Sequence, residues 1–251
     1  AEARFGAMSS YVSISSIKGI FKELESKKIK YGVVPIENSS NGIVNDTING
    51  FSNFNSKIIA EVVLNIHHTL ATTCDRISDI KKIYSKDIAF DQCRKFLTNF
   101  GLDEVELIPV ESTTKAAKLA SNEPNCAAIC PHVAAKLYNL PILFENIEDK
   151  DNNKTRFFIL SDFENAPSGN DKTSILVKFP DEQGVLVRFL NDFNNAGINL
   201  TKIKSHIVEG DSIFFIDFDG HKDDENVKNV LEKHKSSVKV LGSYVKEIKD
   251  I

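Results

Sequence analysis

The order of strand-like and helix-like segments constrains the fold of this chain more than any other feature. Between Lys30 and about Leu160, short apolar runs of strand character alternate with segments whose apolar residues recur at helical spacing. A polar stretch rich in turn-forming residues follows at 161–171. After it the order changes to strand, helix, strand, strand, helix, strand. The sequence therefore predicts two parts of different architecture.

The first part is expected to be an α/β module. Alternating strands and helices at this spacing favour mostly parallel sheets with helices on both faces. Ser112 is placed to cap one helix, and Pro131 is placed at the first position of another. The expected strands are 31–36, 57–66, 106–110, 126–129, 141–147 and 156–160, and the expected helices are 88–100, 113–120 and 131–138.

The second part has the order of a ferredoxin-like βαββαβ domain. Its helix at 185–196 places Leu186, Phe189, Leu190 and Phe193 on one face. The remaining expected elements are strands 173–179, 198–208, 212–218 and 238–246, a turn at 180–184, a turn at 209–211 and a helix at 222–235. The predicted domains are therefore 1–161 and 172–251, and their fold class alone does not give a function.

Composition excludes several classes of protein. A net charge of −4 with no basic stripe argues against nucleic acid as a partner, and no apolar run approaches a membrane span. Four cysteines at unrelated spacings predict buried free thiols in a reducing, cytoplasmic compartment rather than zinc or disulfides. The neighbouring His67 and His68 would point to opposite sides of a strand, so no metal site is expected and a core or hinge role is the favoured interpretation for both.

The start of the chain reads as the end of a helix. Residues 1–6, Ala-Glu-Ala-Arg-Phe-Gly, end on a glycine that is typical of a helix C-terminus. We therefore expect further sequence upstream.

Two polar clusters stand at strand ends, where open α/β sheets bind ligands. The first is Glu37-Asn38-Ser39-Ser40-Asn41-Gly42, which brings together a carboxylate, amides and hydroxyls. An ordinary turn with a helix cap explains it about equally well. The second is Asn153-Lys154-Thr155-Arg156-Phe157-Phe158, which places a hydroxyl and one of the few arginines at the edge of an apolar strand. Arg156 suits carboxylate recognition, and a surface arginine is the alternative.

Two further clusters are weaker. Ser85 precedes Gln92 by two helical turns, so the pair faces one cleft only if Ser85 sits at a cap. Glu111-Ser112-Thr113-Thr114 begins a helix, where free N–H groups and hydroxyls bind carboxylates. For both clusters, simple capping is the favoured interpretation from the residues alone.

In this order and spacing, the clusters resemble the prephenate dehydratase family. The resemblance covers essentially the whole chain, and the Pro-Ile-Glu-Asn-Ser and Thr-Arg-Phe motifs are the most specific. The second part is similar to an ACT domain. The matching stretches are Gly-Val-Val-Pro-Ile-Glu-Asn-Ser-Ser-Asn-Gly at 32–42, Gln92-Cys93, Glu-Ser-Thr-Thr-Lys-Ala-Ala at 111–117, Ala-Ala-Ile-Cys at 127–130, Ala-Ala-Lys-Leu-Tyr at 134–138, Asn-Lys-Thr-Arg-Phe at 153–157, Gln-Gly-Val-Leu-Val at 183–187, Gly-Ile-Asn-Leu-Thr at 197–201 and Val-Leu-Gly-Ser-Tyr at 240–244.

The resemblance implies a two-lobed, periplasmic-binding-protein-like catalytic module, whose second lobe spans about 69–145, and a regulatory ACT domain. It implies that prephenate loses water and carbon dioxide to give phenylpyruvate without a cofactor or metal. Thr155 is the implied key residue, and Glu37 acts either as a proton reservoir for it or as an orienting group. Homodimers or homotetramers and control by phenylalanine are expected. The implied catalytic residues are Thr155, Glu37 and Asn38; the implied substrate-binding residues are Ser39, Ser85, Gln92, Ser112, Thr113, Arg156 and Phe157; and the implied effector-binding residues are Gly184, Leu186, Val187, Asn199, Leu200 and Ser205.

Three stretches depart from the family's pattern. The opening Gly-Pro-x-Gly-Thr-Phe segment is absent, Ser-His-Pro-Gln is replaced by Ser85-Lys86-Asp87-Ile88, and the regulatory Glu-Ser-Arg-Pro is replaced by Lys204-Ser205-His206-Ile207. The last change predicts weak sensing of phenylalanine. The alternatives are arogenate dehydratase and a non-catalytic amino-acid sensor, and the presence of both Glu37 and Thr155 disfavours the sensor. A chorismate mutase upstream is left open.

Overall fold

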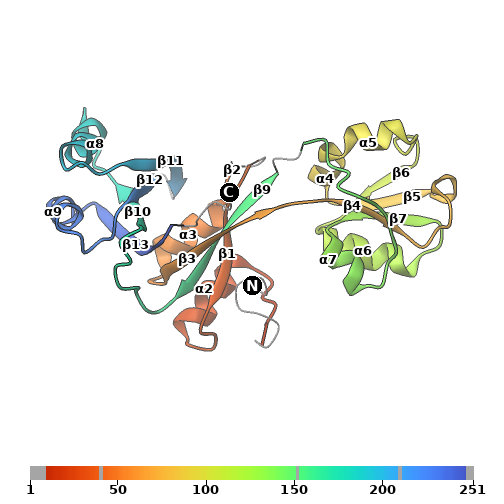
Figure 1. Ribbon diagram of the computed structural model, residues 1–251, viewed down its shortest axis with the longest axis horizontal. Coiled ribbons are helices and arrows are strands. Elements are labelled where there is room, and N and C mark those ends of the chain that lie inside the picture. Colours follow the sequence, from red (N-terminus) through yellow and green to blue (C-terminus); the bar gives the residue numbers. More distant parts are fainter. Residues whose placement is uncertain (1–9, 40–41, 151–152, 209–210, 247–251) are drawn as a thin grey trace. The chain divides into compact units, whose positions relative to one another are not determined.

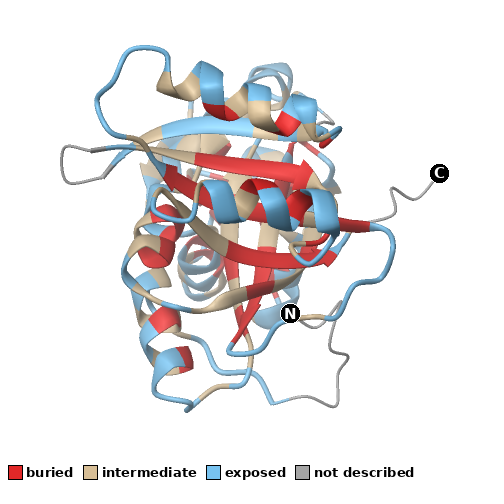
Figure 2. Ribbon diagram, turned by 90° about the vertical axis from the view of Figure 1, so that its left-hand side faces the viewer, coloured by how far each residue is buried: buried red, intermediate tan, exposed pale blue. Residues whose placement is uncertain are grey.

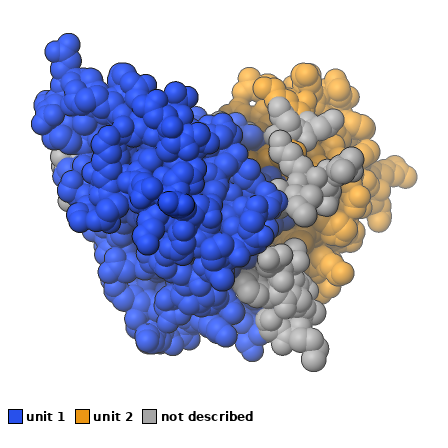
Figure 3. Space-filling model, turned by 60° about the vertical axis from the view of Figure 1, so that its left-hand side comes forward, with its two compact units in different colours: residues 1–64, 155–251 blue, residues 65–154 orange. Residues whose placement is uncertain are grey.

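A computed structural model of the chain describes residues 10–39, 42–150, 153–208 and 211–246. These residues form two compact units, which are coloured separately in Figure 3. Unit 1 comprises 1–64 and 155–251, and unit 2 comprises 65–154. Unit 2 begins four residues before and ends nine residues after the second lobe of about 69–145 expected from the sequence. The predicted helix end at 1–6 lies outside the described residues.

Unit 1 contains two sheets (Figure 1). The first has the strand order β2-β1-β9-β3 and is accompanied by helices α2 and α3, whose residues pack in the same core. Its elements are β1 (Gly32–Asn38), β2 (Gly42–Ile43), β3 (Lys57–Asn65), β9 (Lys154–Ser161), α2 (Ile17–Glu25) and α3 (Asn45–Asn53).

The second sheet of unit 1 is the predicted βαββαβ domain. Its strand order is β11-β12-β10-β13, and all of its strand pairs are antiparallel. Its elements are β10 (Asp171–Lys178), α8 (Val185–Asn195), β11 (Leu200–Val208), β12 (Asp211–Asp219), α9 (Glu225–Lys233) and β13 (Val238–Val245). Of the turn predicted at 209–211, residues 209 and 210 lie outside the described part of the chain.

Unit 2 is built on a five-stranded sheet with the order β6-β5-β7-β4-β8. Alanine-rich α6 packs against the sheet because Ala116, Ala117 and Ala120 all face inward and are fully buried. The elements are β4 (Thr69–Thr72), the 3₁₀ turn η1 (Ile77–Asp79), β5 (Lys82–Ser85), α4 (Asp87–Gln92), α5 (Arg94–Asn99), β6 (Glu106–Pro109), α6 (Thr113–Asn122), β7 (Cys126–Cys130), α7 (His132–Leu137) and β8 (Ile142–Glu145).

The sheet of unit 2 is mixed and the described strand pairs of unit 1 are antiparallel, so the expectation of mostly parallel sheets is wrong. β5 runs parallel to β6 and β7, whereas β4 pairs antiparallel with β7 and β8. In unit 1, β9 pairs antiparallel with β1. The chain leaves unit 1 after β3 and re-enters it along β9, and local sequence signals carry no information on that return direction.

Two predicted helices also differ in detail. The helix expected at 88–100 is two short helices, because Cys93 leaves the helical conformation and is fully buried. Pro131 stands at the N-cap of α7 rather than at its first helical position. The four cysteines are free, and all except Cys74 are buried, as predicted.

The two sheets of unit 1 share one hydrophobic core. Phe158 of β9 lies with its ring centroid 5.9 Å from Tyr244 of β13 and 6.1 Å from Phe215 of β12. The buried parts of the strands stand out against the exposed outer sides of the helices in Figure 2. The ACT-like sheet is therefore packed on the first sheet rather than tethered to it by a linker.

One backbone approach shows how close this packing is. A Cβ atom added at Gly242 of β13 would lie 2.2 Å from the carbonyl oxygen of Ile58 in β3, which is far inside van der Waals contact. Lysines of both parts bind backbone carbonyls across the same boundary: Lys57 Nζ lies 3.2 Å from Val240 O, and Lys239 Nζ lies 2.8 Å from Phe54 O. Glycine at 242 is thus required by space.

Candidate active site

The candidate site in unit 1 is formed where the last residues of β1 lie beside the first residues of β9. The antiparallel register pairs Asn38 with Thr155 and Glu37 with Arg156. Both Glu37 and Asn38 therefore belong to a strand and not to the polar loop expected after it. Ser39 follows as an exposed turn residue, and Ser40 and Asn41 are outside the described residues.

Asn38 and Thr155 are joined by a hydrogen bond. The Asn38 amide Nδ2 donates to Thr155 Oγ1 at 2.8 Å. Because Thr155 accepts this bond, its own hydroxyl proton is left to be given to another oxygen. The same amide would stabilise negative charge that develops on Oγ1 as the proton leaves. The pair can therefore act as a proton donor with a built-in stabilising group.

The two faces of β9 have different environments, because successive side chains of a strand point to opposite faces. Arg156 and Phe158 face the shared core with the ACT-like sheet. Thr155 and Phe157 lie on the other face, where Phe157 is half-buried. The cross-strand partners follow the same division, so Asn38 shares a face with Thr155, and Glu37 shares a face with Arg156.

This division places Glu37 away from the Thr155 hydroxyl. The Glu37 carboxylate forms an ion pair with Lys202 of β11, and both side chains are about a quarter exposed. A direct proton relay from Glu37 to Thr155, one of the two roles weighed from the sequence, does not fit this geometry. The other role, orientation of the site, does.

The guanidinium of Arg156 forms its hydrogen bonds with other side chains of the protein. Its Nε donates to Glu61 Oε2 at 2.6 Å, Nη1 donates to Asp217 Oδ2 at 2.6 Å, and Nη2 donates to the Tyr244 hydroxyl at 3.0 Å. The side chain is 8% exposed, and the guanidinium carbon lies 4.7 Å from the centre of the Phe158 ring. The interpretation of Arg156 as a carboxylate-binding residue for substrate is therefore corrected: it braces β9 against the ACT-like sheet.

The charges in this network balance one another. Burial raises the pKa of the Glu61 carboxyl, but Arg156 and Lys172 outweigh burial and hold that pKa below its ordinary value. Lys172 Nζ lies 2.7 Å from Glu61 Oε1. Burial and the nearby Asp217 raise the pKa of the Tyr244 phenol well above its ordinary value, so it stays protonated. The network is thus two carboxylates held between two cations and a neutral phenol.

In unit 2, the predicted hydroxyl residues have structural partners. Ser85 is fully buried at the end of β5 and donates to the carbonyl of Ile129 at 2.7 Å. Ser112 caps α6 by accepting from the backbone N–H of Lys115 at 3.1 Å, as the capping pattern predicts. Thr113 is half-exposed in the first turn of α6, whose N–H end can still favour an anion.

Gln92 is oriented by a residue that the sequence assigned only a core or hinge role. The Gln92 Oε1 atom lies 2.8 Å from His68 Nε2 and accepts from Asn153 Nδ2 at 3.3 Å. His68 is 4% exposed. The structure therefore does not join Gln92 to Ser85 as a pair. His68 lies between β3 and β4, and no local sequence pattern predicts its contact with Gln92.

The predicted effector residues all lie on the ACT-like domain. Gly184 is the N-cap of α8 and has a φ of +75°, which glycine adopts without strain. Leu186 is half-buried, whereas Val187 and Ser205 are exposed. Asn199 donates to Asp219 at 3.0 Å, directly before Leu200 begins β11.

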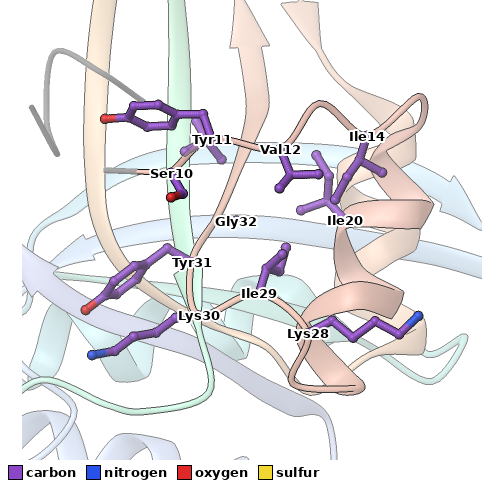
Figure 4. A pocket seen from close by; sticks show the side chains of 11 residues that line it. Ser10, Tyr11, Val12, Ile14, Ile20, Lys28, Ile29, Lys30, Tyr31 and Gly32 are labelled. Carbon is purple, nitrogen blue, oxygen red and sulfur yellow. The ribbon is translucent and has the colours of Figure 1, made fainter. Parts of the chain in front are cut away.

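A cavity with a mainly apolar lining lies elsewhere in unit 1. It measures about 420 Å³ and is formed by the segment 10–14 and the chain from Lys28 to Val33 (Figure 4). The charged residues among its described lining are Lys28 and Lys30, whose ammonium groups point in opposite directions in Figure 4. It contains none of the predicted site residues.

Neither a metal-binding cluster nor a membrane-spanning helix occurs among the described residues. These residues include no cluster of three or more histidine, cysteine, aspartate or glutamate side chains with metal-binding geometry. In the same ranges, every helix is too short or too polar to cross a bilayer.

Comparison with known proteins assigns both parts of the chain. The family model for prephenate dehydratase matches residues 1–165, and the ACT domain model matches 173–235. A bifunctional chorismate mutase/prephenate dehydratase of Aquifex aeolicus is 41% identical over 250 residues, covering 97% of this chain and 69% of that relative. A prephenate dehydratase of Methanocaldococcus jannaschii is 38% identical over 241 residues, covering 92% and 86%.

The fold agrees with a solved relative. The crystal structure of a prephenate dehydratase from Arthrobacter aurescens in complex with L-Phe is 30% identical to this chain, with a TM-score of 0.88. The match covers 98% of this chain and 85% of that one. The family match and the fold together define a two-lobed α/β lyase that carries a small ligand-sensing domain. The chain belongs to the prephenate dehydratase family, whose reaction is that of a hydro-lyase, and its C-terminal part is an ACT domain.

Replacing Arg156 by methionine tests the buried network. The variant leaves the carboxylates of Glu61 and Asp217 buried without their shared cation, so we expect a loss of about 3–5 kcal/mol in the free energy of unfolding. Arg188→Met is the matched control, because that arginine pairs with Glu182 at the exposed surface and should cost less than about 1 kcal/mol. Urea unfolding of both variants makes the comparison, and equal losses would contradict the role of the network.

Proposed function

We propose that this chain converts prephenate to phenylpyruvate and that Thr155 donates the proton for the leaving hydroxyl. The observation that carries the proposal is the Asn38–Thr155 hydrogen bond, in which Thr155 is the acceptor. Membership of the prephenate dehydratase family supports the substrate.

The reaction needs little more than one well-placed proton. Prephenate carries a hydroxyl on C4 and a carboxylate on C1 of a non-aromatic ring. As the C1–carboxylate bond breaks, its electron pair enters the ring, the C4–oxygen bond breaks, and carbon dioxide leaves. The C4 oxygen takes the Thr155 proton and departs as water, and Thr155 regains a proton from solvent. The aromatic product supplies the driving force, so the protein mainly orients and protonates.

The remaining residues are assigned supporting roles. Asn38 stabilises the Thr155 oxygen as it loses its proton. Phe157 shares the face of Thr155 and offers an apolar surface to the ring. Gln92, Ser112 and Thr113 are proposed as hydrogen-bonding residues for substrate, together with Ser39. Ser85 keeps only an acceptor role, since its proton is bonded to Ile129. A cation bound tightly to the departing carboxylate would stabilise it and slow its loss as carbon dioxide. Arg156 is bonded to protein groups instead, which suits the reaction.

Thr155→Ala should lower kcat on prephenate by at least about 100-fold, the scale of general acid catalysis, and change KM by less than about threefold. Thr155→Ser keeps the hydroxyl and should retain much more of the activity. Steady-state kinetics on prephenate and on arogenate are measured for each variant and for the parent. A Thr155→Ala kcat within about threefold of the parent would remove Thr155 from the chemistry. Turnover of arogenate alone would favour the arogenate dehydratase reading, and no turnover of either substrate would favour a sensor.

Phenylalanine is proposed as the effector of the ACT domain, and the relative solved with L-Phe supports it. The amino and carboxylate groups would meet backbone around Gly184, Leu186, Val187, Asn199 and Leu200, with Ser205 nearby on β11. The N-terminus of α8 favours a carboxylate. Where the family motif has arginine and proline, this chain has His206 and Ile207.

Inhibition by phenylalanine should therefore be present but weak. Loss of one charged hydrogen bond weakens binding by about 1–2 kcal/mol relative to a chain that has the arginine. Calorimetry and inhibition at millimolar phenylalanine test this, with Gly184→Val expected to abolish the response. Gly169→Val is the control, since Gly169 also has a positive φ and open space around it but lies outside the proposed site. Neither heat nor inhibition from the parent chain would mean that the domain binds another ligand or none.

An oligomer, a homodimer or homotetramer, is proposed as the working form. The edge strand β11 exposes Ile203 and Ile207, which are 43% and 70% accessible, and such an apolar edge is an unfavourable surface to leave in water. Pairing of two ACT sheets along this edge would cover it.

Light scattering at micromolar concentration should accordingly give a mass of at least twice 28.0 kDa. Ile207→Lys should shift the distribution toward the monomer, because it places a charge in the covered edge. A stable 28.0 kDa species from the parent chain would rule the proposal out.

A further inference from the structure

Side chains of the ACT domain bind both members of one cross-strand pair in the first sheet of unit 1. Glu37 and Arg156 lie directly opposite each other on β1 and β9. Glu37 is bound by Lys202 of β11, and Arg156 is bound by Asp217 of β12 and Tyr244 of β13. Three strands of the ACT sheet therefore contact one pair of residues.

The next pair along the same two strands is the proposed catalytic pair. Asn38 follows Glu37, Thr155 precedes Arg156, and the register sets Asn38 opposite Thr155. The register shifts between Pro35 and Glu37, so this part of β1 is an irregularity rather than a regular ladder. Such an irregularity bends its strand and changes the direction of the side chains beside it, so the contacts of Glu37 bear on where the end of β1 lies.

The contacts of Arg156 and the contact of Glu37 with Lys202 differ in how much they contribute to stability. The Arg156 side is deeply buried and serves the stability of unit 1, with Asp217 1% exposed and Tyr244 fully buried. The Lys202–Glu37 side is at the edge of the domain, with the two side chains 26% and 23% exposed. A contact there adds little to stability, since partly exposed ion pairs contribute about 1 kcal/mol or less. It does fix where the end of β1 lies.

We infer that Lys202 of the ACT domain is a positioning residue for the dehydratase reaction, acting through Glu37 to hold the Asn38 amide on Thr155. The inference rests on the proposed role of Thr155. Lys202 touches neither substrate nor the reacting atoms. Without its ammonium group, the end of β1 relaxes and the Asn38–Thr155 hydrogen bond loosens, while the substrate still binds.

The test is Lys202→Met in the whole 251-residue chain, with kinetics on prephenate and no phenylalanine present. The expected result is a fall in kcat of about tenfold or more, since small misplacements of reacting groups are costly, with KM within about threefold. Lys202→Arg keeps the cation and should restore most of the rate. Lys228→Met is the matched control: the same change, in the same domain, at an exposed position of α9, with parental kinetics expected.

A double-mutant cycle separates action through Glu37 from any other effect. Glu37→Gln should lower kcat with little change in KM, and adding Lys202→Met to it should have no further effect. Urea unfolding accompanies every variant and should show midpoints close to that of the parent. If Lys202→Met fails to fold, the Glu37→Gln variant alone carries the same expectation for kcat and KM.

The inference is overturned if Lys202→Met stays within about twofold of the parent kcat or if its effect multiplies with that of Glu37→Gln. Thr155→Ala, measured under the same conditions, distinguishes a failure of this inference from a failure of the proposed function. A parent that turns over prephenate and is disabled by Thr155→Ala, beside an unaffected Lys202→Met, would reject this inference and leave the proposed function standing. A parent with no turnover, or an unaffected Thr155→Ala, would reject the proposed function first.

Discussion

The buried guanidinium of Arg156 is the interaction on which unit 1 depends. It lies between two carboxylates and a phenol that come from β3, β12 and β13, and it stacks on Phe158 of its own strand. The planar guanidinium presents its donors in a fixed fork and stacks on an aromatic ring, and a lysine ammonium offers neither property. Because the charge is neutralised in place, it can stay buried, and β9 is fixed both to β3 of its own sheet and to the ACT sheet.

Fixing one face of β9 leaves the other face for chemistry. Alternation of side chains means that anchoring Arg156 and Phe158 sets the direction of Thr155 and Phe157 without contacting them. The neighbouring strand is divided in the same way, with Glu37 toward the ACT sheet and Asn38 toward Thr155. A single stretch of sequence thus serves both the attachment of the regulatory domain and the reaction, which explains why Thr-Arg-Phe reads as one motif.

What the sequence predicted well was local. The cap at Ser112, the helix at 185–196 and the order of elements in the ACT domain follow from spacing, capping residues and turn formers within a few positions of each other. The direction of β9 against β1, the contact of His68 with Gln92 and the burial of Arg156 depend on residues far apart in the chain. Nothing near Arg156 in the sequence distinguishes a substrate-binding arginine from a buried brace. The candidate residues could therefore be named from the motif, but their division between two faces of a sheet could not.

The contact at Gly242 limits how such a protein can be rebuilt. Since β13 passes so close to Ile58 that no side chain fits between them, the surface that the ACT sheet presents is shaped for this particular first sheet. An ACT domain grafted from another enzyme would have to supply a glycine at the same position and matching partners for Arg156. Exchange of the ACT domain for one from another family would therefore require redesign of the whole boundary. Specificity for a new effector is more readily sought by changing the outer edge of the existing domain than by replacing it.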